Sequence, residues 1–246
     1  MGGRGSSSGG GGGTVSLEEI TDHGLFDKKL DPVKMTDNQF ADLITDSLDA
    51  DIPLFLDDTP LQKVMYVAGL NEKPQVMTDA QFNQYVRQHR AETLYRTVDG
   101  VYLKQYDMGI NAKDICEQVM YGSLTRTGRG SLMGDGFYFA NDLDDSKRYG
   151  TYTGNVKQTA YMKAVLKPGA KGISSSRIYS MARDEISNNT KLGRALEKAV
   201  KGRFHSGVMA LLAVHKGYDY IEYSSYGYFN VLNRGCLIMS DQISPK

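Results

Sequence analysis

Several features that would assign this 246-residue chain to a class are scarce or missing. It has no tryptophan, and its only cysteines are Cys116 and Cys236. Two cysteines cannot build a disulfide framework or a zinc site, and because both lie in apolar stretches we expect them to be small core residues. The formal net charge is +0, so nothing predicts broad attraction to nucleic acid or membrane, although a local basic patch stays open.

Long apolar runs and common cofactor motifs are also missing. No stretch approaches the length of a membrane-spanning helix, and the N-terminus lacks the hydrophobic region of a secretory signal. The sequence has no phosphate-binding loop, no dinucleotide fingerprint and no repeat. His205 and His215 lack suitably spaced partners for a metal. We therefore expect neither a metal nor a membrane partner.

What remains is a globular composition, with 40% hydrophobic and 24% charged residues. Residues 1–15 are the exception, because a tail rich in glycine and serine cannot bury a core; a flexible tether and a leftover linker explain it equally well. Residues 16–90 carry helical signals, with three helices expected to begin near Thr36, Pro60 and Thr78. We expect a small helical subdomain there.

After residue 90 strands and helices alternate. Strands are predicted at 93–98, 137–140, 158–167, 218–223, 228–232 and 236–239, and helices at 111–120, 179–186, 191–200 and 206–216. The last two strands are expected to pair with each other around residues 233–235. Strands scattered among helices indicate an α+β fold with a mixed or antiparallel sheet.

The stretch from Gly134 to Tyr149 is the most informative part of the chain. Two glycines flank Asp135 and permit backbone geometries and close ligand approach that a side chain would block. An apolar strand follows, then a helix start with Ser146 and Tyr149 three positions apart on one face. Tyr138, Ser146 and Tyr149 could therefore border one cleft, although an ordinary strand–turn–helix with aromatic core residues gives the same pattern.

Two neighbouring features could also serve a ligand. Arg96 lies in the apolar strand 93–98, where a charge is costly unless it is paired or faces a cleft; an edge-strand arginine facing water is the alternative. Residues 122–134 form a glycine-rich loop with Arg126 and Arg129, of the kind that closes over ligands. These arginines could meet a phosphate, or they could simply be solvated.

The stretch from Gly134 to Tyr149 resembles the nicotinamide-pocket segment of poly(ADP-ribose) polymerase catalytic domains, which belong to the ADP-ribosyltransferase family. That segment reads G-x-G-x-Y-F-A-D, followed by a serine and a tyrosine. The resemblance implies that Tyr138 and Tyr149 sandwich the nicotinamide ring of NAD. It also implies that Ser146 hydrogen-bonds the carboxamide and that Gly136 lets the strand lie close.

Residues 94–96 resemble the first-strand arginine of the toxin-like branch of this family. This implies that Arg96 grips the ribose or phosphates of NAD with its planar fork of donors, and that the backbone of Thr97 pairs with the carboxamide. Residues 230–235 resemble the last motif of that branch, a glutamate followed by V-L with R-G slightly later. The chain, over residues 60–240, also resembles ADP-ribosyltransferase-like domains found with phage head-morphogenesis proteins.

The sequence departs from the family at the catalytic glutamate. That position falls on Asn230, or on Tyr228 in the polymerase register, and neither is a carboxylate. An asparagine can hold the ribose 2′-hydroxyl but cannot supply the charge that stabilises the leaving of nicotinamide. Glu222, on the preceding strand, is a candidate substitute, unless its carboxylate faces away from Arg96 and Tyr138.

Taken together, the resemblance implies that an ADP-ribosyltransferase-like catalytic domain at 91–246 follows the helical subdomain in the sequence, with NAD as substrate and no metal. Three functions stay open. The chain could be a mono-ADP-ribosyltransferase acting on a protein or nucleic-acid acceptor, an inactive structural or interaction module of a phage or prophage particle, or an NAD glycohydrolase. Other phage or host proteins are expected partners, and the expected location is the bacterial host cytoplasm or the phage particle.

Overall fold

A computed structural model describes residues 30–53, 56, 59–70, 72–99, 111–123, 125, 133, 135–150, 159–200 and 206–244. The predicted tail at 1–15 and most of the predicted loop at 122–134 lie outside these residues. The helices are η1 (Pro32–Lys34), α2 (Asp37–Leu48), α3 (Pro60–Val67), α4 (Asp79–His89), α6 (Ala112–Tyr121), α7 (Leu143–Gly150), α8 (Ser175–Ser187), α9 (Lys191–Val200), α10 (Ser206–His215), η3 (Ser224–Tyr226) and η4 (Arg234–Cys236). The strands are β1 (Gln75–Met77), β2 (Leu94–Asp99), β3 (Phe137–Ala140), β4 (Thr159–Leu166), β5 (Gly172–Ser174), β6 (Tyr220–Tyr223), β7 (Tyr228–Val231) and β8 (Leu237–Ser240).

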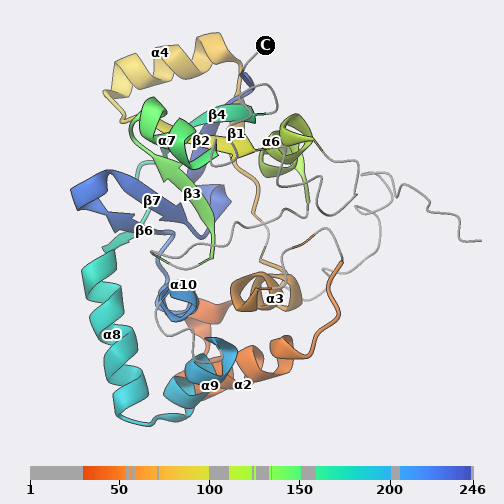
Figure 1. The fold of residues 1–246 in the computed structure, drawn as a ribbon, viewed down its shortest axis with the longest axis vertical. Helices are drawn as coiled ribbons and strands as arrows, with labels where there is room; N and C mark the ends of the chain where they lie inside the picture. The colour runs from red at the N-terminus through yellow and green to blue at the C-terminus, as the bar shows by residue number, and fades with distance from the viewer. Residues whose placement is uncertain are drawn as a thin grey trace, which may run out of the picture.

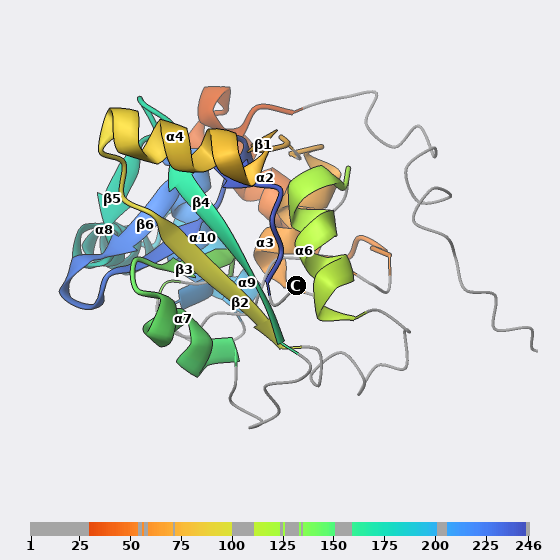
Figure 2. The ribbon, with the colours of Figure 1, turned by 90° about the horizontal axis from the view of Figure 1, so that it is seen from above.

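The described strands form a mixed sheet in the order β1-β8-β4-β2-β3-β7-β6-β5, and Figure 2 shows β2 alongside β4. β1 is parallel to β8 and β5 is parallel to β6, while the other neighbours are antiparallel. β2 pairs with β4 along its whole length, but within the described residues it pairs with β3 only where Tyr95 meets Ala140. The α+β prediction is confirmed, and the sheet consists of two halves with a narrow junction.

The predicted pairing of strands 228–232 and 236–239 is wrong. β7 pairs with β3 and β6, whereas β8 pairs with β1 and β4. The chain between them forms the 3-10 turn η4, in which Asn233 Oδ1 accepts a hydrogen bond from Gly235 N at 2.9 Å. Arg234 is 2% exposed in this turn, whereas a hairpin loop would leave it in solvent. The chain therefore crosses here from one half-sheet to the other.

Two hydrophobic cores lie on opposite faces of the sheet. Helices α2, α3, α8, α9 and α10 pack on the half made by β3, β7, β6 and β5, and Figure 1 shows them gathered below the strands. Phe40 and Ile221 are fully buried in this core, called the helical core below. On the other face α6 packs on β4 and β2, and Val119 of α6 belongs to a cluster that also contains Phe137 of β3 and Leu237 of β8. We call this second cluster the α6 core.

Both cysteines are buried in the α6 core, as predicted. Burial raises the pKa of the Cys116 thiol to about 12, and it does the same for Cys236. A thiol needs to ionise to act as a nucleophile or metal ligand, so these two are packing residues at neutral pH.

The predicted helix starts are confirmed, and each has a local cause. Thr36 and Thr78 begin α2 and α4 with capping boxes, in which the threonine side chain and the glutamine three residues later satisfy each other's backbone amides. Thr59 caps α3, whose first residue is Pro60. The strands β1 and β5 were not predicted, because three residues are too few to display a two-residue periodicity.

The helices of the predicted 16–90 subdomain lie in two different places. α2 packs on α9, and α3 on α10. In contrast, β1 pairs with β8, and α4 buries Phe82 against Val165 of β4 and Ile238 of β8. The N-terminal third of the chain therefore contributes both to the helical core and to the edge of the sheet.

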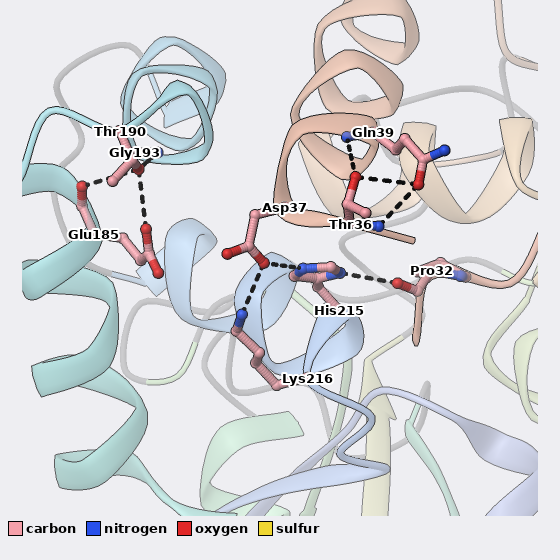
Figure 3. Close-up of polar contacts among 9 residues, drawn as sticks. All are labelled: Pro32, Thr36, Asp37, Gln39, Glu185, Thr190, Gly193, His215 and Lys216. Carbon is pink, nitrogen blue, oxygen red and sulfur yellow. Dashed lines mark hydrogen bonds and ion pairs between the residues drawn. The ribbon is translucent and has the colours of Figure 1, made fainter. Parts of the chain in front are cut away.

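A charged cluster fixes the start of α2 to the end of α10 (Figure 3). Asp37 Oδ1 lies 2.7 Å from Nε2 of the buried His215 and 2.9 Å from Lys216 Nζ. His215 Nδ1 lies 2.8 Å from the Pro32 carbonyl oxygen, and the ring stacks on Phe40 with 4.4 Å between centroids. The hydrogen bonds from His215 and then from Lys216 lower the pKa of Asp37.

This cluster predicts a specific loss of stability in acid. A lowered pKa means that ionised Asp37 stabilises the fold above its unfolded pKa of about 4, and that this stabilisation disappears as pH falls through the folded-state value. Asp37→Asn should lower the melting temperature at pH 7 by roughly 1–3 °C and flatten its dependence on pH below about 4. Circular dichroism melts from pH 7 to 2 measure both the melting temperature and its dependence on pH.

Exposed Asp46 of the same helix is the control, since Asp46→Asn should change neither quantity. Identical acid limbs in wild type and Asp37→Asn would contradict the assignment.

Candidate functional site

Tyr138, on β3, lies at the centre of the site that the sequence predicts. It is directly paired with Asn230 of β7, so the two side chains project from the same face of the sheet, where Tyr138 packs against the helical core. The Tyr138 hydroxyl accepts a hydrogen bond from the backbone N of Met133 at 2.9 Å. The ring is half-buried, which leaves part of it accessible to a ligand.

Arg96 connects β2 to β3 at the narrow junction. Its Nη1 donates to the carbonyl oxygen of Tyr138 at 3.3 Å, and its guanidinium carbon lies 5.8 Å from the centroid of the Phe137 ring. Because Tyr95 is paired with Ala140, on the Tyr138 face, Arg96 projects to the opposite face with Phe137. β2 lies between β4 and β3, so the edge-strand alternative is excluded.

Thr97 and Ser146 meet between β2 and α7. Their hydroxyl oxygens lie 2.9 Å apart although 49 positions separate them in sequence. Ser146 is 4% exposed, and Asp142 Oδ1 accepts from the backbone N of Asp145 in the first turn of the helix, as the predicted helix start requires. The side chain of Tyr149 lies outside the described part of the structure, so its sandwich with Tyr138 stays a prediction.

Asn230 is fully buried and holds the segment that leads into β3. Its Nδ2 donates to the carbonyl oxygens of Met133 at 3.0 Å and Asp135 at 3.1 Å. A Cβ atom on Gly136 would overlap Asn230 Oδ1 and lie 2.8 Å from its Cγ, and Gly136 has a φ of +156°. Glycine is therefore required at this position by the approach of Asn230, a reason that the sequence did not reveal.

Glu222 does not lie beside Asn230. The strand register pairs Glu222 with Phe229, which belongs to the α6 core, and pairs Asn230 with Ile221, which belongs to the helical core. Since neighbouring residues of a strand point to opposite faces, Glu222 points away from the Tyr138 face. It shares the face of the β2 arginine, but β3 and β7 separate their strands. The register therefore gives no support to Glu222 as a substitute for the family's glutamate.

The role of Arg234 was not predicted from the sequence. Nη1 donates to the carbonyl oxygens of Gln118 at 3.0 Å and Val119 at 2.9 Å, and Nη2 donates to the carbonyl of Gly122. These carbonyls lie at the end of α6, where few helical amides remain as donors; the Gln118 carbonyl also accepts a hydrogen bond from the backbone N of Gly122 at 2.9 Å. Burial lowers the pKa of Arg234 to about 10, so it remains charged at neutral pH and complements the negative end of the helix dipole.

A separate cavity of about 480 Å³ lies between η1, the end of α10 and the turn after β7. Pro32, Val33, Tyr218, Asp219 and Asn233 are among the residues that line it. None of the predicted NAD-site residues contributes to its wall, so the cavity does not locate the predicted nicotinamide pocket.

Comparison of the chain with protein-family models, curated proteins and solved structures finds no match. Within the described residues no group of three histidine, cysteine, aspartate or glutamate side chains could hold a metal ion, and none of the helices there is long and apolar enough to cross a membrane. What the site can do chemically follows from its own geometry: a half-buried tyrosine ring on β3, and two hydroxyls in contact with each other between β2 and α7, each of which can donate and accept a hydrogen bond.

The close approach of Asn230 predicts that Gly136→Ala is destabilising for steric reasons. The matched control is Gly169→Ala, because Gly169 also has a positive φ, of +87°, but has nothing within 4 Å of an added Cβ. Both variants carry backbone strain, and only the first displaces Asn230. Gly136→Ala should lose roughly 1–3 kcal/mol more unfolding free energy than Gly169→Ala in urea titrations. Equal losses would mean that Asn230 moves aside freely.

The helix-end contacts of Arg234 predict a larger effect. Arg234→Met should lower the unfolding free energy by about 3 kcal/mol, because buried carbonyl oxygens at the end of α6 lose their donors. Arg234→Lys should recover only part of this, since an ammonium lacks the planar fork. Urea unfolding followed by circular dichroism provides the measurement, with exposed Arg183 on α8 as control. A stability of Arg234→Met equal to that of Arg183→Met would disprove this role.

Proposed function

We propose that the chain binds NAD above β2 and β3, beside α7, and transfers a single ADP-ribose unit to a protein or nucleic-acid acceptor with release of nicotinamide. The observation that carries this proposal is the contact between Thr97 and Ser146, at 2.9 Å. These residues come from two sequence motifs that the family resemblance assigns to one nicotinamide pocket. Arg96 of the first motif also bonds Tyr138 of the second, at 3.3 Å.

The arrangement suits the nicotinamide group chemically. A carboxamide has one acceptor oxygen and two N–H donors, and the hydroxyls of Thr97 and Ser146 can both donate and accept. The half-buried ring of Tyr138 supplies an aromatic face for stacking. Arg96, on the other face of the sheet, contributes by tying β2 to the backbone of β3 at Tyr138. The division of the sheet at this junction also supports an ADP-ribosyltransferase-like fold.

A second function, NAD binding without turnover, is favoured by the position of Asn230. Its amide nitrogen is used by two backbone carbonyls, and Glu222 projects from the opposite face. A site without the family's carboxylate lacks the charge that stabilises the oxocarbenium-like transition state, and such terms are worth about 10²–10³ in rate. This second function corresponds to a structural or interaction module, for which phage or host proteins are the proposed partners.

Calorimetry with NAD and incubation with labelled NAD in a bacterial lysate test these functions together. Wild type should bind NAD, and Ser146→Ala should weaken binding by about tenfold through loss of a buried hydrogen bond. Arg96→Ala should abolish turnover by releasing β3 at Tyr138 from β2, since Arg96 itself lies on the face opposite the proposed NAD site. Ser180→Ala on the exposed side of α8 is the control and should behave as wild type.

The outcomes separate the candidate functions. Label on a macromolecule that disappears in Arg96→Ala supports the transferase. Free nicotinamide without a labelled acceptor indicates an NAD glycohydrolase instead. Binding without consumption of NAD supports the binding module. The absence of both binding and consumption contradicts the NAD site and leaves a structural or interaction module that does not use NAD.

A further inference from the structure

Asn230 and Tyr138 are linked through the backbone of Met133. Asn230 Nδ2 donates to the Met133 carbonyl oxygen at 3.0 Å, and the Met133 N–H donates to the Tyr138 hydroxyl at 2.9 Å. Met133 is fully buried and part of the helical core. Because Tyr138 and Asn230 are also direct partners between β3 and β7, the two side chains and Met133 form a closed arrangement on one face of the sheet.

The chemistry of this arrangement requires an amide at position 230. A primary amide has two N–H donors, and Asn230 directs its nitrogen to two acceptors, the carbonyl oxygens of Met133 and Asp135. An ionised carboxylate has only acceptors and would repel both carbonyls. Asparagine at this position is therefore matched to its surroundings by hydrogen-bond polarity, and a glutamate there would meet the wrong partners.

We propose that Asn230 is a positioning residue for Tyr138: through Met133 it fixes the Tyr138 hydroxyl, and with it the plane of the ring that stacks on nicotinamide. This inference rests on the proposed NAD site. It assigns to Asn230 a role other than that of the family's catalytic glutamate, since the amide acts on the protein's own backbone and contacts no reacting atom. The substitution Asn230→Glu should consequently weaken NAD binding and leave turnover unimproved.

A double-mutant cycle on the dissociation constant for NAD tests the link. Asn230→Asp is nearly isosteric but removes both donors, and it should weaken NAD binding by about tenfold. Tyr138→Phe keeps the stacking ring and removes the hydroxyl, and it should weaken binding by a smaller factor. The double variant should bind no more weakly than Asn230→Asp alone, because both changes break the same chain of contacts.

The control comes from the turn that follows β7. Asn233 Nδ2 also donates to side chains, those of Asp219 at 3.0 Å and Glu72 at 3.3 Å, but not to the segment before β3. Asn233→Asp should therefore lower stability without coupling to Tyr138→Phe. If the effects of Asn230→Asp and Tyr138→Phe on NAD affinity simply multiply, as those of independent sites do, the positioning role is overturned. Should Asn230→Asp fail to fold, Asn230→Ser, which retains one donor, replaces it in the cycle.

A measurement without NAD separates this inference from the proposed function. 3-Fluorotyrosine incorporated at position 138 gives a ¹⁹F NMR signal that reports the orientation and surroundings of the ring. Asn230→Asp should shift or broaden this signal, whereas Asn233→Asp should leave it in place. An unchanged signal in Asn230→Asp overturns the inference. Failure of wild type to bind NAD, with the signal still sensitive to Asn230, would overturn the proposed function and the role in NAD binding, but not the orientation of Tyr138 by Asn230.

Discussion

Backbone carbonyls that are buried away from water need donors, and in this protein one short segment supplies them at two critical places. Arg234 satisfies the end of α6, and Asn230, four residues earlier, satisfies the backbone before β3. Both ends of the connection from α6 to β3 are therefore attached to the chain that follows β6. Within the described residues β3 is paired along its whole length with β7 but only at Ala140 with β2, so the pairing with β7 and these side-chain to backbone hydrogen bonds together position β3 and Tyr138.

The weak pairing between β2 and β3 leaves side chains to connect the two halves of the sheet. Where two strands pair along their whole length, the backbone N–H and C=O groups of one strand bond those of the other, and only side chains remain to contact a ligand. At this junction the sheet halves are connected through side chains instead, by Arg96 to the Tyr138 carbonyl and by Thr97 to Ser146 of α7. A ligand that bridges the halves could replace or reinforce such contacts. Sites at the boundary of two packed units are common for this reason.

Local signals in the sequence predicted the helices and most strands well. Capping threonines define the starts of α2 and α4, and apolar runs define β3, β4 and β7. The family resemblance implied one pocket for Thr97 and Ser146, but the contact between their hydroxyls, which joins residues 49 positions apart, has no local signal and was not predicted. Partners that depend on register could not be predicted. The face on which Glu222 lies follows from its pairing with Phe229, and no local pattern fixes that pairing.

The same limit explains the error at β7 and β8. Two apolar runs around an Asn-Arg-Gly turn satisfy every local rule for a hairpin, and only the burial of Arg234 against α6, more than a hundred positions away, separates them. The hydrogen bonds of Asn230 were not predicted for a related reason. The residues around an asparagine in an apolar strand do not indicate which backbone groups, far away in the sequence, its side chain will contact. Long-range hydrogen bonds from side chains to the backbone are the part of this site that could not be predicted from the sequence.

The cluster of Asp37 with His215 has a consequence for the order of events during synthesis. It joins residues 178 positions apart, and the core beneath it combines α2 and α3 from the beginning of the chain with α9 and α10 from near its end. While a ribosome makes the chain from its N-terminus, the apolar face of α2, with Phe40 and Ile44, can pack only on α3 until α9 and α10 emerge. Contacts of such high sequence separation form slowly, and an exposed apolar face during that interval is the kind of surface that chaperones bind.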